Sequence, residues 1–136
     1  MTLTGHCLCK AVTYKADVSE PLITAYDHCD DCQRQSGSTY SLVTVVPKEK
    51  LTISGPIKKW EGKGSSGHSV WRLFCSECGS PIAHDPDAAP EIIALKAGTL
   101  DSDIKKKLNP DTEIWTVSKL PFCKENLSKP FKYMPE

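Results

Sequence analysis

The sequence lacks an excess of charge of either sign. Its 17 basic residues are balanced by 17 acidic residues, so the chain has no long-range field with which to attract DNA, RNA or an anionic membrane. It also lacks any run of 18 consecutive apolar residues, and the opening MTLTGHCLCK has no charged segment followed by an apolar one. We therefore expect a cytoplasmic protein with no signal peptide, no membrane span and no nucleic-acid partner.

The sequence has little helical periodicity. No segment keeps the helical spacing of apolar residues over three turns, and the best candidate, residues 101–108, is long enough for a turn or two. Short segments rich in Val, Ile, Thr and aromatic residues instead predict strands at 11–18, 40–47, 51–54, 68–74, 91–98 and 112–118. The GKGSSG sequence at 62–67 predicts the turn between a strand ending near Trp60 and one starting near His68. These features predict one all-β domain covering 1–136, without repeats or linkers.

Disulfides are not expected, because thiols stay reduced in the cytoplasm, so the seven cysteines indicate metal binding or catalysis. Six of them form three close pairs, namely Cys7 with Cys9, Cys29 with Cys32, and Cys75 with Cys78. Gly79 directly follows the last pair and permits the positive backbone angle that a zinc knuckle tends to need. The first pair is spaced so that both sulfurs would point to one face of a strand. Two pairs would complete a four-sulfur zinc site, but spacing alone leaves three ways of choosing them.

The segment YDHCDDCQRQSGS at 26–38 suggests a different kind of site. Two thiolates with one oxygen or nitrogen ligand would leave a zinc coordination position open for water or substrate, as in catalytic sites. Cys29 and Cys32 could equally form an unmetallated pair. A thioredoxin-type redox dithiol is disfavoured, because it needs a helix N-terminus in a βαβ unit that the pattern does not predict. As a strand neighbour of Asp27, His28 would point away from the ligands.

Three motifs occur in a particular order: GHCLCKAVTY, DHCDDCQRQSGS and FCSECGSPI. In this order they resemble the glutathione-dependent formaldehyde-activating enzyme family, which also includes the domain of centromere protein V. The likeness covers residues 5–82, with a weaker echo in AGTLD and IWTVSKLPF. It implies a single zinc-stapled β-tent domain of short antiparallel strands, with a structural zinc on Cys7, Cys9, Cys75 and Cys78. It also implies a second, catalytic zinc on the cysteines of the family's C-H-C-x-x-C stretch, with glutathione as co-substrate.

The sequence departs from the family pattern at one predicted ligand. Asp27 stands where the family has the first cysteine of that stretch, whereas His28, Cys29 and Cys32 match it. A carboxylate can bind zinc, so Asp27, Cys29 and Cys32 are the predicted catalytic and metal-binding residues of the second site. Equally, the shorter reach of the carboxylate would leave that site weak or empty.

The activity that the resemblance implies is a zinc-dependent carbon–sulfur lyase that joins glutathione to formaldehyde or another small electrophile. Ser36 and the Gly37 amide are then expected to stabilise the developing alkoxide, while Arg34, together with Arg72, binds the carboxylates of glutathione. The alternative is a non-catalytic, zinc-stapled binding or scaffold module in which Asp27 marks the loss of catalysis. We expect His84 to be structural and Cys123 to be a half-buried free thiol.

Overall fold

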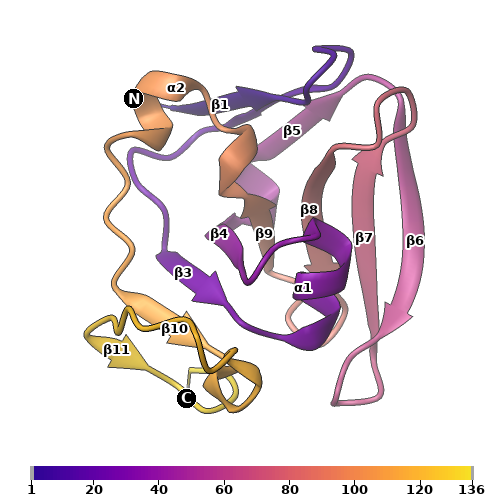
Figure 1. The fold of residues 1–136 in the computed structure, drawn as a ribbon. Helices are drawn as coiled ribbons and strands as arrows, with labels where there is room; N and C mark the ends of the chain where they lie inside the picture. The colour runs from indigo at the N-terminus through magenta and orange to yellow at the C-terminus, as the bar shows by residue number, and fades with distance from the viewer. Residues whose placement is uncertain (1, 136) are drawn as a thin grey trace.

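The computed structural model describes residues 2–135, and these form mainly β structure in two sheets. The smaller sheet is antiparallel, has the order β1-β2-β5, and consists of β1 (Leu3–His6), β2 (Thr13–Ala16) and β5 (Leu51–Ser54). Figure 1 shows this sheet at the top of the view, across one end of the larger sheet. The prediction of a mainly β fold built from short antiparallel strands is confirmed, except at one edge of the larger sheet.

The larger sheet has the order β11-β10-β3-β4-β9-β8-β7-β6. Its strands are β3 (Ile23–Asp27), β4 (Ser41–Pro47), β6 (Ile57–Lys63), β7 (Ser69–Cys75), β8 (Pro81–Pro86), β9 (Ile92–Lys96), β10 (Thr112–Ile114) and β11 (Lys129–Pro130). The pairings from β3 to β6 are antiparallel. By contrast, β10 runs parallel to both β3 and β11, so the sheet departs from the antiparallel prediction at this edge.

The helical elements are short. They are α1 (Asp30–Ser36), α2 (Ser102–Lys105) and the 3₁₀ turns η1 (Lys48–Lys50), η2 (Ala97–Thr99) and η3 (Thr116–Ser118). α2 confirms the turn expected within 101–108, whereas α1 was not predicted. It ends at Gly37 in the left-handed region, with φ of 69°. Cys29 directly precedes the first residue of α1, so the helix N-terminus that a redox dithiol needs is present, although it was not predicted. The strands on either side, β3 and β4, are antiparallel, so the βαβ unit of a thioredoxin-type site is not formed here.

The larger sheet separates two apolar clusters. Ile93 and Leu95 of β9 belong to the main core, which packs against the smaller sheet, while Ala94 belongs to a second cluster with Ala25 and Val43. Because successive strand side chains point to opposite faces, Lys96 falls on the same face as Ala94. The sheet thus carries a charged side chain to the face that lies away from its main core.

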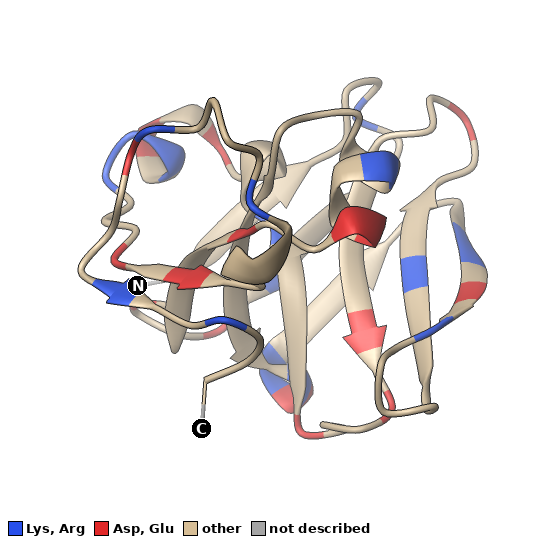
Figure 2. Ribbon diagram, turned by 60° about the horizontal axis from the view of Figure 1, so that its bottom comes forward, with Lys and Arg blue, Asp and Glu red and all other residues tan. Residues whose placement is uncertain are grey.

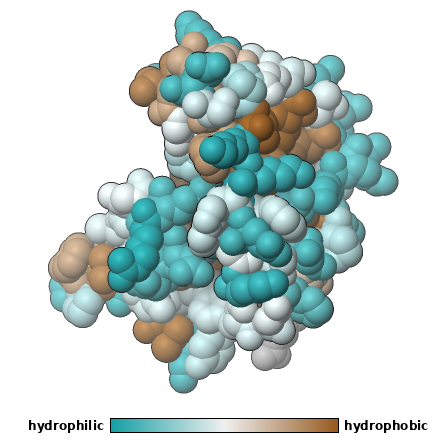
Figure 3. Space-filling view, turned by 90° about the vertical axis from the view of Figure 1, so that its right-hand side faces the viewer, coloured by the Kyte–Doolittle hydropathy of each residue, from teal (hydrophilic) through white to brown (hydrophobic). Residues whose placement is uncertain are grey.

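Residues of both charge signs are spread over many elements in the view of Figure 2. On the side turned toward the viewer in Figure 3, hydrophobic residues gather in the upper half amid hydrophilic ones. Within residues 2–135 no helix has the length and apolar character needed to cross a membrane.

Candidate functional site

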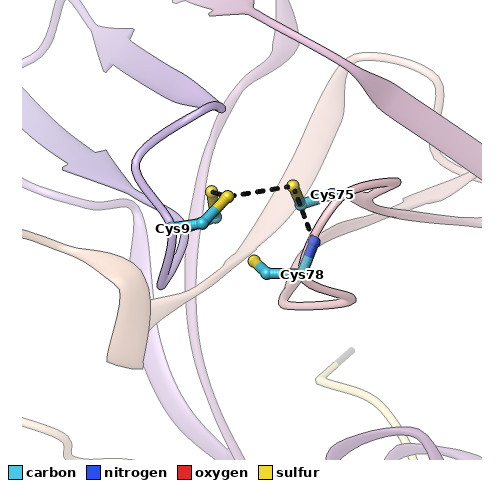
Figure 4. A group of neighbouring side chains, drawn as sticks. Cys9, Cys75 and Cys78 are labelled. Atoms are coloured by element: carbon cyan, nitrogen blue, oxygen red, sulfur yellow. Dashed lines mark hydrogen bonds between the residues drawn. The ribbon is translucent and has the colours of Figure 1, made fainter.

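Four cysteine sulfurs converge where the two sheets meet. The Sγ atoms of Cys7, Cys9, Cys75 and Cys78 all lie within 4.8 Å of one another. Cys7 Sγ is 3.6 Å from Cys9 Sγ, which is 3.8 Å from Cys75 Sγ. Figure 4 shows the side chains of Cys9, Cys75 and Cys78 pointing toward a common centre. Zinc–sulfur bonds of about 2.3 Å in a tetrahedron require sulfurs about 3.8 Å apart, so these four residues fit a zinc ion.

The first cysteine pair reaches this cluster from a turn and not from a strand as expected. β1 ends at His6, and the Lys10 amide donates to the Cys7 carbonyl at 3.1 Å. Lys10 has a φ of 68°, which closes the turn. The Val12 amide then donates to Cys7 Sγ at 3.3 Å. A reversal of the backbone between Cys7 and Lys10 therefore brings the sulfurs of Cys7 and Cys9 together, instead of the strand geometry that the spacing suggested.

The second pair forms the predicted knuckle between β7 and β8. The amides of Glu77 and Cys78 point at Cys75 Sγ, at 3.4 and 3.5 Å, and Gly79 has the positive φ, 77°, that its position suggested. The Ser80 hydroxyl lies 3.2 Å from Cys78 Sγ and also accepts a hydrogen bond from the Leu8 amide, in the turn that carries the first pair. Hydrogen bonding from Ser80 lowers the pKa of Cys78 to about 5, which favours the thiolate form that binds metals.

A second group of potential ligands lies on the α1 side of the larger sheet. Donor atoms of Asp27, at the end of β3, Cys32, in α1, and His84, in β8, lie within 4.8 Å of one another and could hold a metal ion. Cys32 Sγ donates to the Asp27 carboxylate at 3.2 Å. Cys29 is not a member of this group, and its amide donates to Asp27 at 3.1 Å. The structure thus brings together two of the three predicted residues and adds His84.

Two buried cations face the Cys32 sulfur. Arg72 is 8% exposed, and its Nη1 donates to Cys32 Sγ at 3.4 Å and to the Gln35 side chain at 3.2 Å. Lys96 is 5% exposed, and its Nζ lies 4.0 Å from the same sulfur and 3.3 Å from His84 Nδ1. The group therefore contains a carboxylate, a thiol, an imidazole and two basic side chains.

The pKa values of Asp27, Lys96 and the adjacent Cys29 are shifted from their ordinary values. Burial raises the pKa of Asp27 to about 7, with a further contribution from Cys32. Interaction with the Cys32 side chain lowers the pKa of Cys29 to about 7. Burial lowers the pKa of Lys96 from its ordinary value, while the nearby cysteines and Asp27 act against that shift. Perturbed pKa values of this kind concentrate at functional sites.

The remaining predicted contacts lie on and beyond α1. Arg34 has a 77% exposed side chain and pairs with Asp30 at 2.8 Å. The Ser36 hydroxyl bonds within the end of the helix, and Gly37 is exposed there. A role for these three residues in ligand binding stays a prediction. Arg72, expected to bind a substrate carboxylate, is instead buried against Cys32.

His28 and Cys123 occupy the positions that their sequence context suggested. His28 is fully buried, lies outside both groups of potential ligands, and is 2.8 Å from the Glu113 carboxylate through Nε2. Cys123 is a partly buried free thiol. Two surface clefts, of about 640 and 740 Å³, are lined by other parts of the chain, and neither contains a residue of the two ligand groups.

Comparison with known proteins agrees with the motif pattern. A family model described as glutathione-dependent formaldehyde-activating enzyme matches residues 2–118. An uncharacterized lyase of Schizosaccharomyces pombe is 30% identical over 78 residues, which are 57% of this chain and 53% of that protein. A protein of Aspergillus flavus and one of Aspergillus oryzae, both provisionally named glutathione-dependent formaldehyde-activating enzyme, are 30% identical over 81 residues, 57% of this chain and 42% of theirs. The chain spans about half the length of these curated relatives.

A solved structure supports the fold independently. The crystal structure of a Rhodobacter sphaeroides protein matches with a TM-score of 0.58 at 19% identity, covering 79% of this chain and 91% of that one. At this identity the likeness concerns the arrangement of the strands and not the chemistry of the site.

Proposed function

Since the chain belongs to the glutathione-dependent formaldehyde-activating enzyme family, we propose that it is a carbon–sulfur lyase that joins glutathione to formaldehyde or another small electrophile. The observation that carries this proposal is the buried charged group around Cys32, made of Asp27, Arg72 and Lys96 beside His84. Burying charges costs free energy that apolar packing would not. The charged group around Cys32 lies on the sheet face away from the main core, and this position favours a catalytic role for it over a structural one.

Zinc has a structural role in this proposal. Cys7, Cys9, Cys75 and Cys78 would hold it, and four sulfur ligands leave no position open for substrate. The ion would link the turn after β1 to the turn after β7 and so fix the two sheets relative to each other. The catalytic site is a separate place on the other face of the larger sheet.

In the proposed reaction, negative charge moves from the glutathione sulfur to the carbonyl oxygen, and the second site must stabilise it there. The sulfur of glutathione attacks the carbonyl carbon, the electron pair of the broken π bond moves to oxygen, and the thiol proton ends on that oxygen. Hydrogen-bond donors aimed at the oxygen lower the barrier. We place the peptide part of glutathione along the exposed end of α1, where Arg34, Ser36 and the Gly37 amide would contact it.

One observation favours the alternative of a non-catalytic binding module. Asp27 replaces a cysteine of the family pattern, and Cys29 falls outside the group of ligand atoms that Asp27 and Cys32 form with His84. A chain that had lost catalysis would keep the four-sulfur cluster and lose glutathione binding, so glutathione binding separates the two functions.

We expect the wild-type protein to bind glutathione in calorimetry and to accelerate formation of S-(hydroxymethyl)glutathione, followed by exchange NMR. Cys32→Ser removes the sulfur that Asp27, Arg72 and Lys96 all contact, so its rate should fall about a hundredfold, the low end of what such site groups contribute. Cys123→Ser is the matched control and should keep the wild-type rate. Wild-type protein that neither binds glutathione nor exceeds the uncatalysed rate would leave the binding module as the function.

A further inference from the structure

We infer that Lys96, with Arg72, supplies the positive charge of the second site in place of a zinc ion. The inference about charge and metal content rests on the geometry alone. The role of the two side chains toward a substrate, given below, rests on the proposed function.

The contacts of Lys96 place its ammonium among the groups that would bind the metal. Its Nζ lies 3.3 Å from His84 Nδ1 and 4.0 Å from Cys32 Sγ, which are two of the three potential ligands. It also donates to the Ser41 hydroxyl at 3.0 Å. The ammonium is thus directed at lone pairs that a metal would need, and Lys96 has little freedom to withdraw because it is 5% exposed.

Register fixes this arrangement. Val43 on β4 lies opposite Lys96 on β9, and Arg72 on β7 lies opposite His84 on β8. The two cations therefore project from strands on either side of β8 toward the same helix. Cys32 meets both of them from α1, so its sulfur lies between two basic side chains.

The first cluster lacks such neighbours, which makes it a useful internal comparison. Within residues 2–135, no Lys or Arg side chain hydrogen-bonds to the sulfurs of Cys7, Cys9, Cys75 or Cys78, and backbone amides and a serine hydroxyl surround them instead. A divalent ion there would meet no cation that is hydrogen-bonded to its ligands. A divalent ion at the second site would meet two like charges at close range in a buried setting, where Coulomb repulsion is strong.

The fixed cations can perform the electrostatic task of the reaction. As the carbon–sulfur bond forms, the carbonyl oxygen gains the electron pair, and an ammonium or guanidinium N–H can donate to it. The proton released by the glutathione thiol ends on that oxygen, so the step balances without an oxidant or a further reactant. The Cys32 sulfur contacts both basic groups and so holds them in place between turnovers.

Metal content tests this assignment directly. After exposure to zinc and removal of the excess, wild type and Cys32→Ser should each retain one zinc per chain, measured by elemental analysis. Lys96→Met keeps the length of the side chain and removes its charge. This variant should bind cobalt at a second site at least tenfold more tightly than wild type, with a new thiolate-to-cobalt charge-transfer band. The double variant Lys96→Met/Cys32→Ser should lose that band.

Lys15→Met, which removes a lysine from an exposed strand position, is the matched control and should gain no metal. Two zincs per wild-type chain, with one lost in Cys32→Ser, would overturn the inference even if Lys96→Met failed to fold. So would a folded Lys96→Met protein that binds no second metal. Neither result depends on glutathione, so a chain with one zinc and no lyase activity would remove the proposed function and leave this inference standing.

Discussion

Cys75→Ser is expected to unfold the chain, which is the largest effect of any single substitution that we predict. Structural zinc contributes on the order of 10 kcal/mol or more to small domains, whereas whole domains are stable by about 5–15 kcal/mol. Cys75 is fully buried, and two backbone amides point at its sulfur. The far-ultraviolet circular dichroism of the variant should show a largely unfolded chain at 25 °C, and a strong chelator should do the same to wild type.

Cys32→Ser is the control that separates the two sites. Cys32 is as buried as Cys75, but in our assignment Cys32 holds no structural metal. The Cys32→Ser protein should therefore stay folded and unfold cooperatively on heating. Similar unfolding of both variants would mean that the cysteines are wrongly divided between the sites. A wild-type fold that is indifferent to chelators, with much less than one zinc per chain, would remove the structural zinc altogether.

The strands that the sequence predicted are those with an apolar and β-branched pattern of their own. The segments at 40–47, 51–54 and 68–74 appear as β4, β5 and β7 almost residue for residue. β1, β3, β8 and β11 were missed, because LTGH, ITAYD and KP are short or mixed and PIAHDP begins and ends with proline. Pairing within a sheet stabilises such segments, and their own sequence does not show it.

The same distinction applies to the candidate sites. The four-sulfur cluster follows from local spacing together with the family likeness, since each pair forms its own turn. His84 and Lys96 lie on different strands from Asp27 and Cys32, with no characteristic spacing among them. They meet through the register of β4, β9, β8 and β7. α1 also escaped prediction, because seven residues are too few to show an apolar stripe.

A buried ion-pair network joins the C-terminal segment to the second site. Glu113 of β10 is 1% exposed, and its carboxylate is 2.8 Å from both His28 Nε2 and Lys119 Nζ. The backbone amide of Leu127 donates to it at 2.9 Å. Gln33 of α1 donates to the carbonyls of His28 and Ser118. The Glu113 carboxylate thus holds the segment after β10 against His28, which lies between Asp27 and Cys29 in the sequence.

Glu113→Ala is therefore expected to destabilise the fold by about 3–5 kcal/mol, because removing one partner leaves the others buried without compensation. Urea unfolding followed by tryptophan fluorescence measures the change. Asp111→Ala is the matched control, since Asp111 makes a comparable pair with Lys129 at 3.1 Å between exposed side chains, and exposed pairs add little stability. Equal destabilisation by the two substitutions would contradict a buried network. A loss confined to Glu113→Ala, with proteolysis starting after residue 118, would show that this carboxylate fixes the C-terminal segment beside the site.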